Sequence, residues 1–503
     1  MRARLSILVA GLALIPIAAQ ALMPQLSDLD SVPLALVRAP LAKQIESASE
    51  KSTPLQFAVK VPLALELPDG LWDNIDLDTA RWRLRVRSPE ATSLSFEFSR
   101  FHLPQGAQLW IYDAAGTLAQ GPYKAADATP TGKLWTAMVL GEEAVIELRV
   151  APALSGQIAL TLASVAHGFR DLAAQASSSA AGSDSCNIDV ACPEGDDWRS
   201  EIRAVARVSI DSTFTCSGEA LNNSRQDNDP LFITANHCGI GQNLCGADHA
   251  QYCDPSSVVV YWNYQDSACR PNTGTRTRNG SLAQNQTGAT LLASDVGSDF
   301  TLLRLNNAPS DAFNVYMAGW NATSDVPQSG VAIHHPAGDE KSISVYSSPA
   351  ERADTCIEGT VENCSRDVHA WGVHWSAGTT QQGSSGGGLW DQNRLLVGWL
   401  SGGLASCSNP DQEDFFARME TAWTAGSQDN QQLKHWLAPD RDVKTLCGRN
   451  RSSGPCDAAV TAATVTEQRG GSLDWLALLP LALLGRARAR ASGSTCSRSP
   501  PSG

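Results

Sequence analysis

Two patterns of apolar and polar positions divide the chain. Residues 81–87 and 94–98 alternate strictly between apolar and other side chains, and residues 145–150 do so from Ile146 onward, a period of two that is typical of half-buried strands. From Cys186 to about Pro439 the pattern changes to short apolar runs separated by turn residues: 204–210, 231–235, 258–262, 300–305, 331–333 and 395–400. Together these patterns predict a small β domain followed by a larger all-β domain of barrels or sandwiches.

Two further stretches carry a local expectation. Residues 415–437 are rich in helix-forming side chains, and we expect a closing helix there that Pro439 stops. Arginine occupies every second position from Arg81 to Arg87. We interpret this row as a solvated strand face, with a binding face as the alternative.

The first 21 residues read as a secretory signal peptide. A basic start, Met1 to Arg4, precedes an apolar run from Leu5 to Ala19 and the small-x-small end Ala19-Gln20-Ala21. Export permits disulfides. Of the thirteen cysteines, twelve can pair with one another, and Cys496 is the remaining one.

The cysteines also mark a domain boundary, because residues 22–180 contain none whereas 186–456 contain twelve. Small polar residues from 173 to 185 indicate a protease-sensitive linker. We interpret residues 22–180 as a β-rich propeptide that helps the domain at 181–440 to fold or keeps it silent.

Residues 441–469 read as a tether with a Cys447–Cys456 loop, and residues 470–503 as a tail. Gly470-Gly471, an apolar run to Leu484 and a cluster of arginines make that tail resemble the GlyGly-CTERM sorting signal of Gram-negative bacteria. The run is shorter than the roughly 20 residues of a membrane span. The resemblance implies transient membrane association, removal by a rhomboid-type enzyme, and a secreted or cell-surface protein; a fortuitous apolar tail is the alternative.

Composition narrows the function classes. The chain has 503 residues, 43% apolar and 18% charged, which is ordinary for globular protein and allows two or three domains. Its formal charge of −14 excludes nucleic acid as the main partner, because phosphate binding requires clustered basic surface.

Three residues together suggest nucleophilic catalysis. Ser385 lies in Gly383-Ser384-Ser385-Gly386-Gly387, where glycines let backbone amides approach a ligand. Alone, this segment is typical of a flexible loop. A serine hydroxyl becomes a nucleophile only when a base removes its proton. His237 follows the apolar strand 231–235, and Asp299 precedes the strand 300–305, where a carboxylate could orient an imidazole.

The order His237, Asp299, Ser385 differs from that of the α/β-hydrolases and the subtilisins. With Thr-Ala-x-His-Cys and Gly-Ser-Ser-Gly-Gly around its ends, the set resembles the trypsin-like serine peptidases. More narrowly, residues 185–196, 260–265, 298–303 and 333–336 resemble the bacterial lysyl endopeptidases, over about 185–440. The resemblance implies two six-stranded β-barrels with the triad between them.

The resemblance also implies residue roles. His237 would be the general base, Asp299 its orienting carboxylate and Ser385 the nucleophile, with the amides of Gly383 and Ser385 as the oxyanion hole. The implied disulfides are Cys186–Cys407, Cys192–Cys269 and Cys216–Cys238; proximity suggests Cys245–Cys253 and Cys356–Cys364. We expect no cofactor and no metal. His334 and His335 are interpreted as structural, because neighbours on a strand point to opposite faces.

Substrate preference depends on the P1 pocket. Asp414 in Asp-x-aromatic-x-Arg matches the pocket aspartate of the lysyl endopeptidases, whereas the trypsin position holds Thr379. Ser401-Gly402-Gly403 resembles the strand that pairs with substrate. The lysyl enzymes have a histidine at the Ser401 position, stacked on a tryptophan without a counterpart here. We therefore expect protein or peptide substrates cleaved after lysine and, more slowly, arginine, with the propeptide as a second partner.

A catalytically silent trypsin fold that binds at a surface is the alternative from another class. A glutamyl endopeptidase is disfavoured because Asp414 would repel an acidic P1 side chain. Only two lysines, Lys341 and Lys434, lie within 186–439, and none lies between Lys133 and Cys186, so self-processing near the linker would use Arg170.

Overall fold

The computed structural model describes residues 29–39, 51–172, 182–240, 254–269, 279–360 and 363–456. The signal peptide, the tail, most of the linker and three cysteines (Cys245, Cys253 and Cys496) lie outside these residues. Within the described part of the chain, no helix is both long and apolar enough to cross a membrane.

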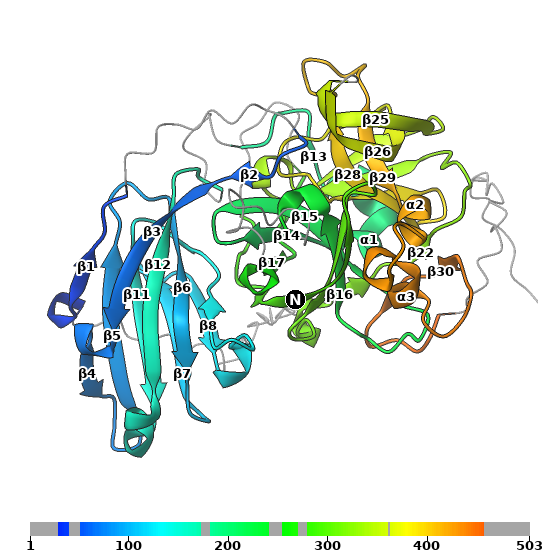
Figure 1. Cartoon of the computed structure of the whole chain (residues 1–503). Helices are drawn as coiled ribbons and strands as arrows, with labels where there is room; N and C mark the ends of the chain where they lie inside the picture. The colour runs from blue at the N-terminus through cyan, green and yellow to red at the C-terminus, as the bar shows by residue number, and fades with distance from the viewer. Residues whose placement is uncertain are drawn as a thin grey trace, which may run out of the picture. The chain divides into compact units, whose positions relative to one another are not determined.

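The front part is built from two sheets, coloured from blue to cyan in Figure 1. The strands of the first sheet, in spatial order, are β1 (Leu34–Leu36), β5 (Ala80–Arg87), β11 (Glu143–Val150), β7 (Gln108–Asp113) and β8 (Ala119–Tyr123). In the same sheet, β4 (Leu71–Asn74) also pairs with β5. Those of the second are β10 (Val139–Leu140), β6 (Ser93–His102), β12 (Ala159–Gly168) and β3 (Ala58–Glu66), with β9 (Leu134–Trp135) on β6. The three alternating segments all lie in strands, as predicted.

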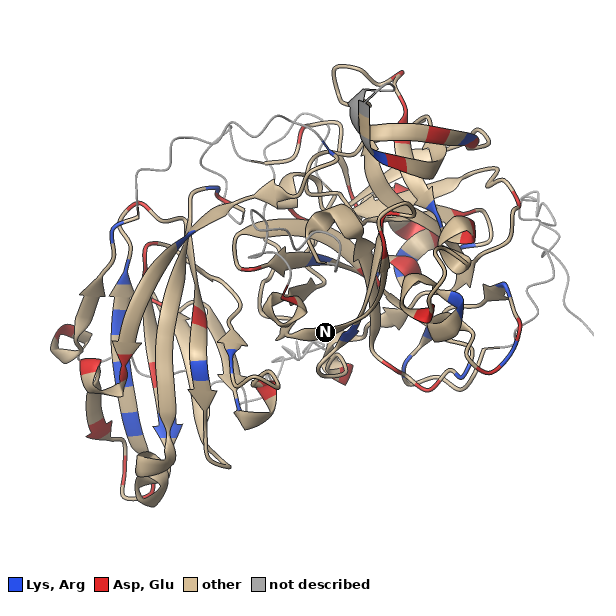
Figure 2. Cartoon of the chain, viewed as in Figure 1, with Lys and Arg blue, Asp and Glu red and all other residues tan. Residues whose placement is uncertain are grey.

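The arginine row on β5 is not a solvated face, so that expectation was wrong. Arg83 is only 2% exposed, and Lys or Arg positions, coloured blue, recur along the ribbon of β5 in Figure 2. Arg81 and Arg83 both bind Asp73 on β4, at 2.7 and 3.0 Å, and Arg85 binds Glu143 on β11 at 2.7 Å. Carboxylates on the two flanking strands thus neutralise the row.

Two larger sheets follow, and the predicted all-β class is confirmed. The first runs β18 (Asn285–Thr287), β17 (Val259–Trp262), β14 (Val205–Ile210), β15 (Phe214–Leu221), β16 (Leu231–Ala235), β20 (Phe300–Leu305) and β19 (Ala289–Asp295). The second runs β13 (Ile188–Asp189), β24 (Ser342–Tyr346), β23 (Gly330–His334), β27 (Gly388–Asp391), β28 (Leu396–Gly403), β29 (Asp414–Arg418), β26 (Asn363–Val373) and β25 (Glu351–Thr360). One continuous buried cluster, including Phe232, Trp262, Trp320 and Trp399, lies between them.

Short elements complete this part. β22 (Trp320–Asn321) pairs with β28 and with β30 (Thr445–Leu446), and β21 (Tyr316–Met317) pairs with β31 (Arg449–Asn450). The described helices include α1 (Arg199–Ile202), α2 (Met419–Trp423) and α3 (Lys434–Leu437). The expected helix over 415–437 is therefore corrected: its start lies in β29, where Phe416 packs into a buried cluster and tertiary burial overrides local propensity. The rest of the range contains the short helices α2 and α3, and α3 closes this part and ends before Pro439, as predicted.

Disulfides close the fold. The three implied by the resemblance are present, Cys186–Cys407, Cys192–Cys269 and Cys216–Cys238. The Cys356–Cys364 and Cys447–Cys456 loops are present too. The Cys186–Cys407 bridge spans 221 residues and so ties the start of this part to the loop after β28.

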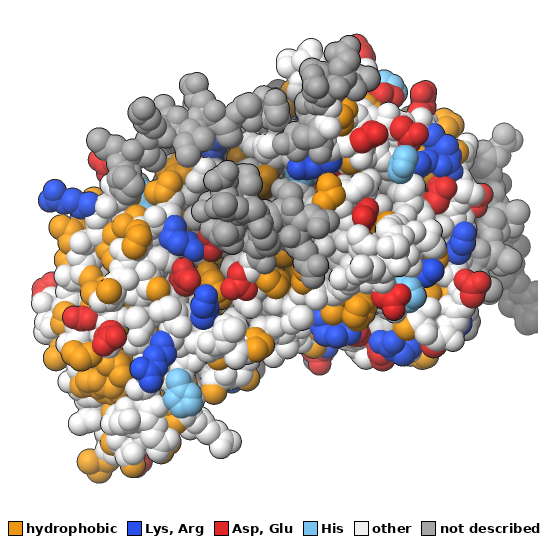
Figure 3. All heavy atoms as spheres, viewed as in Figure 1, with side chains coloured by type: hydrophobic (Ala, Val, Ile, Leu, Met, Phe, Trp, Pro, Cys, Tyr) orange, Lys and Arg blue, Asp and Glu red, His pale blue; other side chains and the backbone are white. Residues whose placement is uncertain are grey.

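The front part contacts the first of the two large sheets. β2 (Leu55–Gln56) pairs antiparallel with the start of β15, and an apolar cluster joins Phe57 and Met138 to Tyr261 and Tyr264. The hydroxyl of Tyr261 accepts from the Met138 amide at 2.9 Å. On the face drawn in Figure 3, acidic and basic side chains are interspersed.

Candidate active site

His237 and Asp299 meet at the ends of two paired strands. β16 runs into a short 3-10 turn, Asn236–Cys238, and the register pairs its last residue, Ala235, with Phe300 at the start of β20. The Nδ1 of His237 lies 2.9 Å from Oδ2 of Asp299, and the His237 amide donates to Oδ1 at 2.9 Å. Two contacts to one carboxylate fix both the position and the tautomer of the imidazole.

The Asp299 carboxylate is fully buried. Burial alone would raise its pKa, but the neighbouring His237, the charge of Arg366 and the Ser401 hydroxyl hold the pKa of Asp299 below its usual value. The Trp399 indole also donates to the Asp299 carbonyl at 2.8 Å. Ser401 is fully buried, and among the described residues its Oγ has no hydrogen-bond partner.

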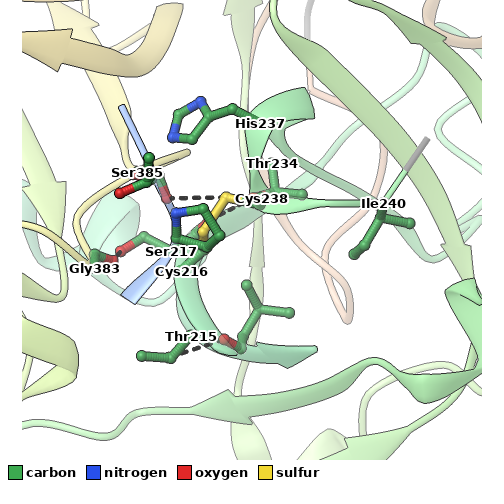
Figure 4. The surroundings of a disulfide bond; sticks show 12 residues. Thr215, Cys216, Ser217, Thr234, His237, Cys238, Ile240, Gly383 and Ser385 are labelled. Atoms are coloured by element: carbon green, nitrogen blue, oxygen red, sulfur yellow. Dashed lines mark hydrogen bonds between the residues drawn. A yellow bond between two sulfur atoms is a disulfide. The ribbon is translucent and has the colours of Figure 1, made fainter. Parts of the chain in front are cut away.

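Ser385 lies beside the Cys216–Cys238 disulfide. Figure 4 shows the imidazole of His237 and the side chain of Ser385 next to one another at this bridge. Ser217, adjacent to Cys216, holds the serine loop twice: its amide donates to the Ser385 carbonyl at 2.8 Å and its hydroxyl to the Gly383 carbonyl at 3.0 Å. The structure therefore brings together the three residues that the sequence singled out.

The glycines around Ser385 are required by the backbone. Gly383 and Gly386 have φ of 94° and 79°, values that favour glycine. A Cβ on Gly386 would lie 2.4 Å from Oγ1 of Thr234. The loop is thus a tight, packed turn, which contradicts the flexible-loop alternative for this segment.

A neutral histidine braces the residue before the nucleophile. The Ser384 hydroxyl accepts from the Gln381 amide at 3.2 Å and lies 2.8 Å from Nδ1 of His334, to which it donates. The Nε2 of His334 in turn donates to Ser344 at 3.0 Å. Burial, with a smaller contribution from Lys51, lowers the pKa of His334 to about 3, in keeping with a neutral ring.

His335 has separate partners. Its Nδ1 lies 2.9 Å from the Asp339 carbonyl, and its ring stacks on Tyr264. The two adjacent histidines therefore face different surroundings, as the strand pattern predicts. Among the described residues, no group of three or more His, Cys, Asp or Glu side chains could hold a metal ion.

Asp414 begins β29 and is fully buried. Its Oδ2 accepts from Trp375 Nε1 at 2.8 Å and from Thr380 Oγ1 at 2.7 Å. Gly403 leaves room for the carboxylate, because a Cβ there would lie 2.2 Å from Oδ1. A Cβ on Gly402 would contact Ile357 and Ser52.

A lysine of the front part binds this carboxylate. Nζ of Lys51 lies 2.6 Å from Oδ1 of Asp414 and also donates to the Ala405 carbonyl. Lys51 is 6% exposed. Burial lowers the pKa of Lys51, although the Asp414 charge and hydrogen bond act in the opposite direction.

The Ser385 hydroxyl is turned towards this lysine. Its Oγ donates to the Lys51 carbonyl at 2.8 Å. Within the described residues, the buried Nε2 of His237 has no hydrogen-bond partner. The hydroxyl must therefore turn from the carbonyl to the imidazole before a proton can pass to His237.

Three pocket residues were not singled out in the sequence: Lys51, Trp375 and Thr380. Thr380 could have been found by its place five residues before Ser385. Trp375 had no family counterpart at a matching spacing, and Lys51 lies in no motif. Each of these residues contacts Asp414 from a segment distant in the sequence, 375–380 or residue 51. These contacts form only when the chain folds.

Residues 180–417 match the sequence-family model described as lysyl endopeptidase, C-terminal domain. A lysyl endopeptidase of Pseudomonas aeruginosa is 26% identical over 441 residues, covering 79% of this chain and 85% of the relative. Among solved structures, the Rv3671c protease of M. tuberculosis in its active form has a TM-score of 0.29 at 14% identity, over 47% of this chain and 88% of that one. The MamO protease domain of Magnetospirillum magneticum has a TM-score of 0.29 at 13% identity, over 44% and 96%.

Proposed function

We propose that this chain is a secreted serine endopeptidase that hydrolyses peptide bonds after lysine and, more slowly, after arginine. The match of residues 180–417 to the lysyl endopeptidase family model and the similarity to a lysyl endopeptidase support this proposal. Ser385 is the nucleophile, His237 the general base and Asp299 the carboxylate that orients it. The amides of Gly383 and Ser385 form the oxyanion hole. Asp414 selects the basic P1 side chain, and Ser401, Gly402 and Gly403 line the strand beside it.

The proposed reaction passes through an acyl-enzyme. Ser385 Oγ attacks the carbonyl carbon while His237 Nε2 takes its proton, and the imidazolium then gives this proton to the leaving amine. The contact of Asp299 with Nδ1, at 2.9 Å, supports this direction of proton transfer, because it leaves Nε2 as the basic nitrogen. Water releases the acyl group by the same steps in reverse.

One observation carries the proposed specificity: a lysine ammonium lies 2.6 Å from the buried carboxylate of Asp414 while the carbonyl of the same residue lies 2.8 Å from Oγ of Ser385. The distance from nucleophile to pocket base therefore fits a lysine side chain. A buried carboxylate also disfavours an acidic side chain at P1.

We further propose that residues 22–180 act as a propeptide that silences the enzyme, as contacts between the front part and the pocket support. The tail, 470–503, is proposed to mediate transient membrane association at a Gram-negative cell surface before its removal.

Paired peptides that differ only in P1, with Lys, Arg or Glu, test the activity. We expect kcat/KM to fall in the order Lys, Arg, Glu, together with labelling of Ser385 by an organophosphonate probe. A purified protein that neither cleaves nor reacts with the probe would instead be a silent binding protein.

A further inference from the structure

Residues 51–56 lie along the candidate active site, with a turn at 51–53 and a short strand at Leu55–Gln56. Lys51 binds Asp414 with Nζ at 2.6 Å, and its carbonyl accepts from Ser385 at 2.8 Å. Both Lys51 and Ser52 are almost fully buried, at 6% and 5% exposure. The Lys51–Ser52 peptide bond therefore lies at the nucleophile, and the Lys51 side chain before this bond is already bound to Asp414.

The residues after this bond are held by separate contacts. Arg366 Nη1 donates to the Ser52 carbonyl at 3.1 Å, and Gln382 Nε2 donates to Thr53 Oγ1 at 3.0 Å. Leu55 and Gln56 then form β2 and pair antiparallel with β15, Leu55 opposite Thr215. Addition of a strand to a sheet edge, with a side chain in a specificity pocket, is a recurring way to bind a peptide.

The side-chain and backbone contacts favour a bound substrate over a simple domain contact. A domain contact requires neither a lysine on the pocket carboxylate nor a carbonyl at the nucleophile. Here both coincide in one residue, and Gln382 and Arg366 hold the two residues that follow.

We propose that residues 51–56 are an internal substrate and that the enzyme hydrolyses its own Lys51–Ser52 bond. The inference rests on the proposed function. Ser385 Oγ bonds to the Lys51 carbonyl carbon, the bond to the Ser52 nitrogen breaks, and the proton from Oγ passes through His237 to that nitrogen. Water then hydrolyses the Lys51 ester, leaving a Lys51 carboxylate and a Ser52 amine.

The cleavage is intramolecular. Lys51 is buried in the pocket of its own chain, so a second copy reaches neither its side chain nor its carbonyl. The rate constant for the cut is therefore independent of protein concentration. A Ser385→Ala chain mixed with active enzyme keeps its Lys51–Ser52 bond for the same reason.

The experiment follows the N-termini of the exported full-length chain by mass spectrometry over a tenfold range of concentration. We expect an end at Ser52 in the wild type and in Lys60→Gln, a matched control whose lysine instead pairs with Asp211 and Glu97. Lys51→Gln should form this end at least about 100-fold more slowly, Lys51→Arg should retain it at a reduced rate, and Ser385→Ala should not form it.

Hydrolysis of an added lysyl peptide and phosphonate labelling are followed in the same samples. Peptide hydrolysis by a chain whose Lys51–Ser52 bond stays intact would overturn the inference and leave the proposed function standing. A Ser52 end that forms in proportion to protein concentration, or equally fast in Lys51→Gln, would also overturn it. Absence of both hydrolysis and labelling in every variant would instead refute the proposed function.

Discussion

The indole Nε1 of Trp375 donates to Oδ2 of Asp414 at 2.8 Å. Thr380 donates to the same oxygen, whereas the Lys51 ammonium binds Oδ1. One carboxylate oxygen is therefore committed to the protein, and the other remains for the substrate. A single ammonium is satisfied by that arrangement, but the guanidinium fork of arginine pairs best with both oxygens.

We therefore predict that kcat/KM for lysine exceeds that for arginine by less than about 100-fold, or roughly 2.7 kcal/mol, with both cleaved. In Trp375→Phe, which keeps a ring against Phe416 but removes one of the two donors to Oδ2, the ratio should fall by about tenfold. Paired substrates that differ only at P1 measure it. Trp436→Phe, whose ring packs on Arg304, is the matched control, and an unchanged ratio in Trp375→Phe would contradict the argument.

Ser385→Ala and His237→Ala should each reduce kcat by several powers of ten while the protein still folds, because the members of a catalytic unit act together. Kinetics on a lysyl peptide, with circular dichroism as the folding control, measure this. Turnover at the wild-type level in purified Ser385→Ala protein would refute the assigned roles.

Activation should not require a free N-terminus that pairs with the residue before the nucleophile. That residue, Ser384, has no charge and is hydrogen-bonded to His334 at 2.8 Å. A mature enzyme extended by a few N-terminal residues is therefore expected to keep its kcat/KM, and loss of activity on extension would show that the prediction is wrong.

Acid should destabilise the fold through His334. Its pKa is about 3 in the folded protein but about 6.5 in the unfolded chain. Below pH 6.5 the unfolded chain binds a proton that the folded protein excludes, so the contribution of His334 to stability is complete above pH 6.5 and is lost as the pH falls towards 3. From pH 7 to pH 5 the free energy of unfolding should drop by about 2 kcal/mol from this residue alone.

Denaturant unfolding at the two pH values, in a Ser385→Ala background that prevents autolysis, measures this drop. It should shrink by about 2 kcal/mol in His334→Gln and stay unchanged in His369→Gln, since the His369 side chain is 56% exposed. An equal drop in all three proteins would contradict the assignment to His334.

The sequence predicted the strands, the disulfides and the residues that meet at the candidate site, because each depends on local pattern or on a motif. Residues 231–235 and 300–305 are apolar runs bounded by turn residues. They form the paired strands β16 and β20. Asp414 could be located for the same reason, within a five-residue segment that matches a family.

What the sequence did not predict depends on contacts between distant segments. Helix formers at the start of the range 415–437 form a strand because β29 pairs with both β28 and β26, with Phe416 opposite Leu400 and Trp371. Arginines on β5 are neutralised by Asp73 and Glu143, which no alternation reveals. Lys51 reaches Asp414 across 363 residues.

Lysine is nearly absent from the domain that carries Asp414. Lys341 is fully buried, with its ammonium on the Ile202 carbonyl, so Lys434 is the remaining lysine between 186 and 439. Copies that are concentrated together after export are therefore poor substrates for one another, to the extent that the site prefers lysine to arginine. A variant with a weaker preference for lysine would also cleave after the many arginines of neighbouring copies. Such a variant should lose its activity faster in concentrated solution.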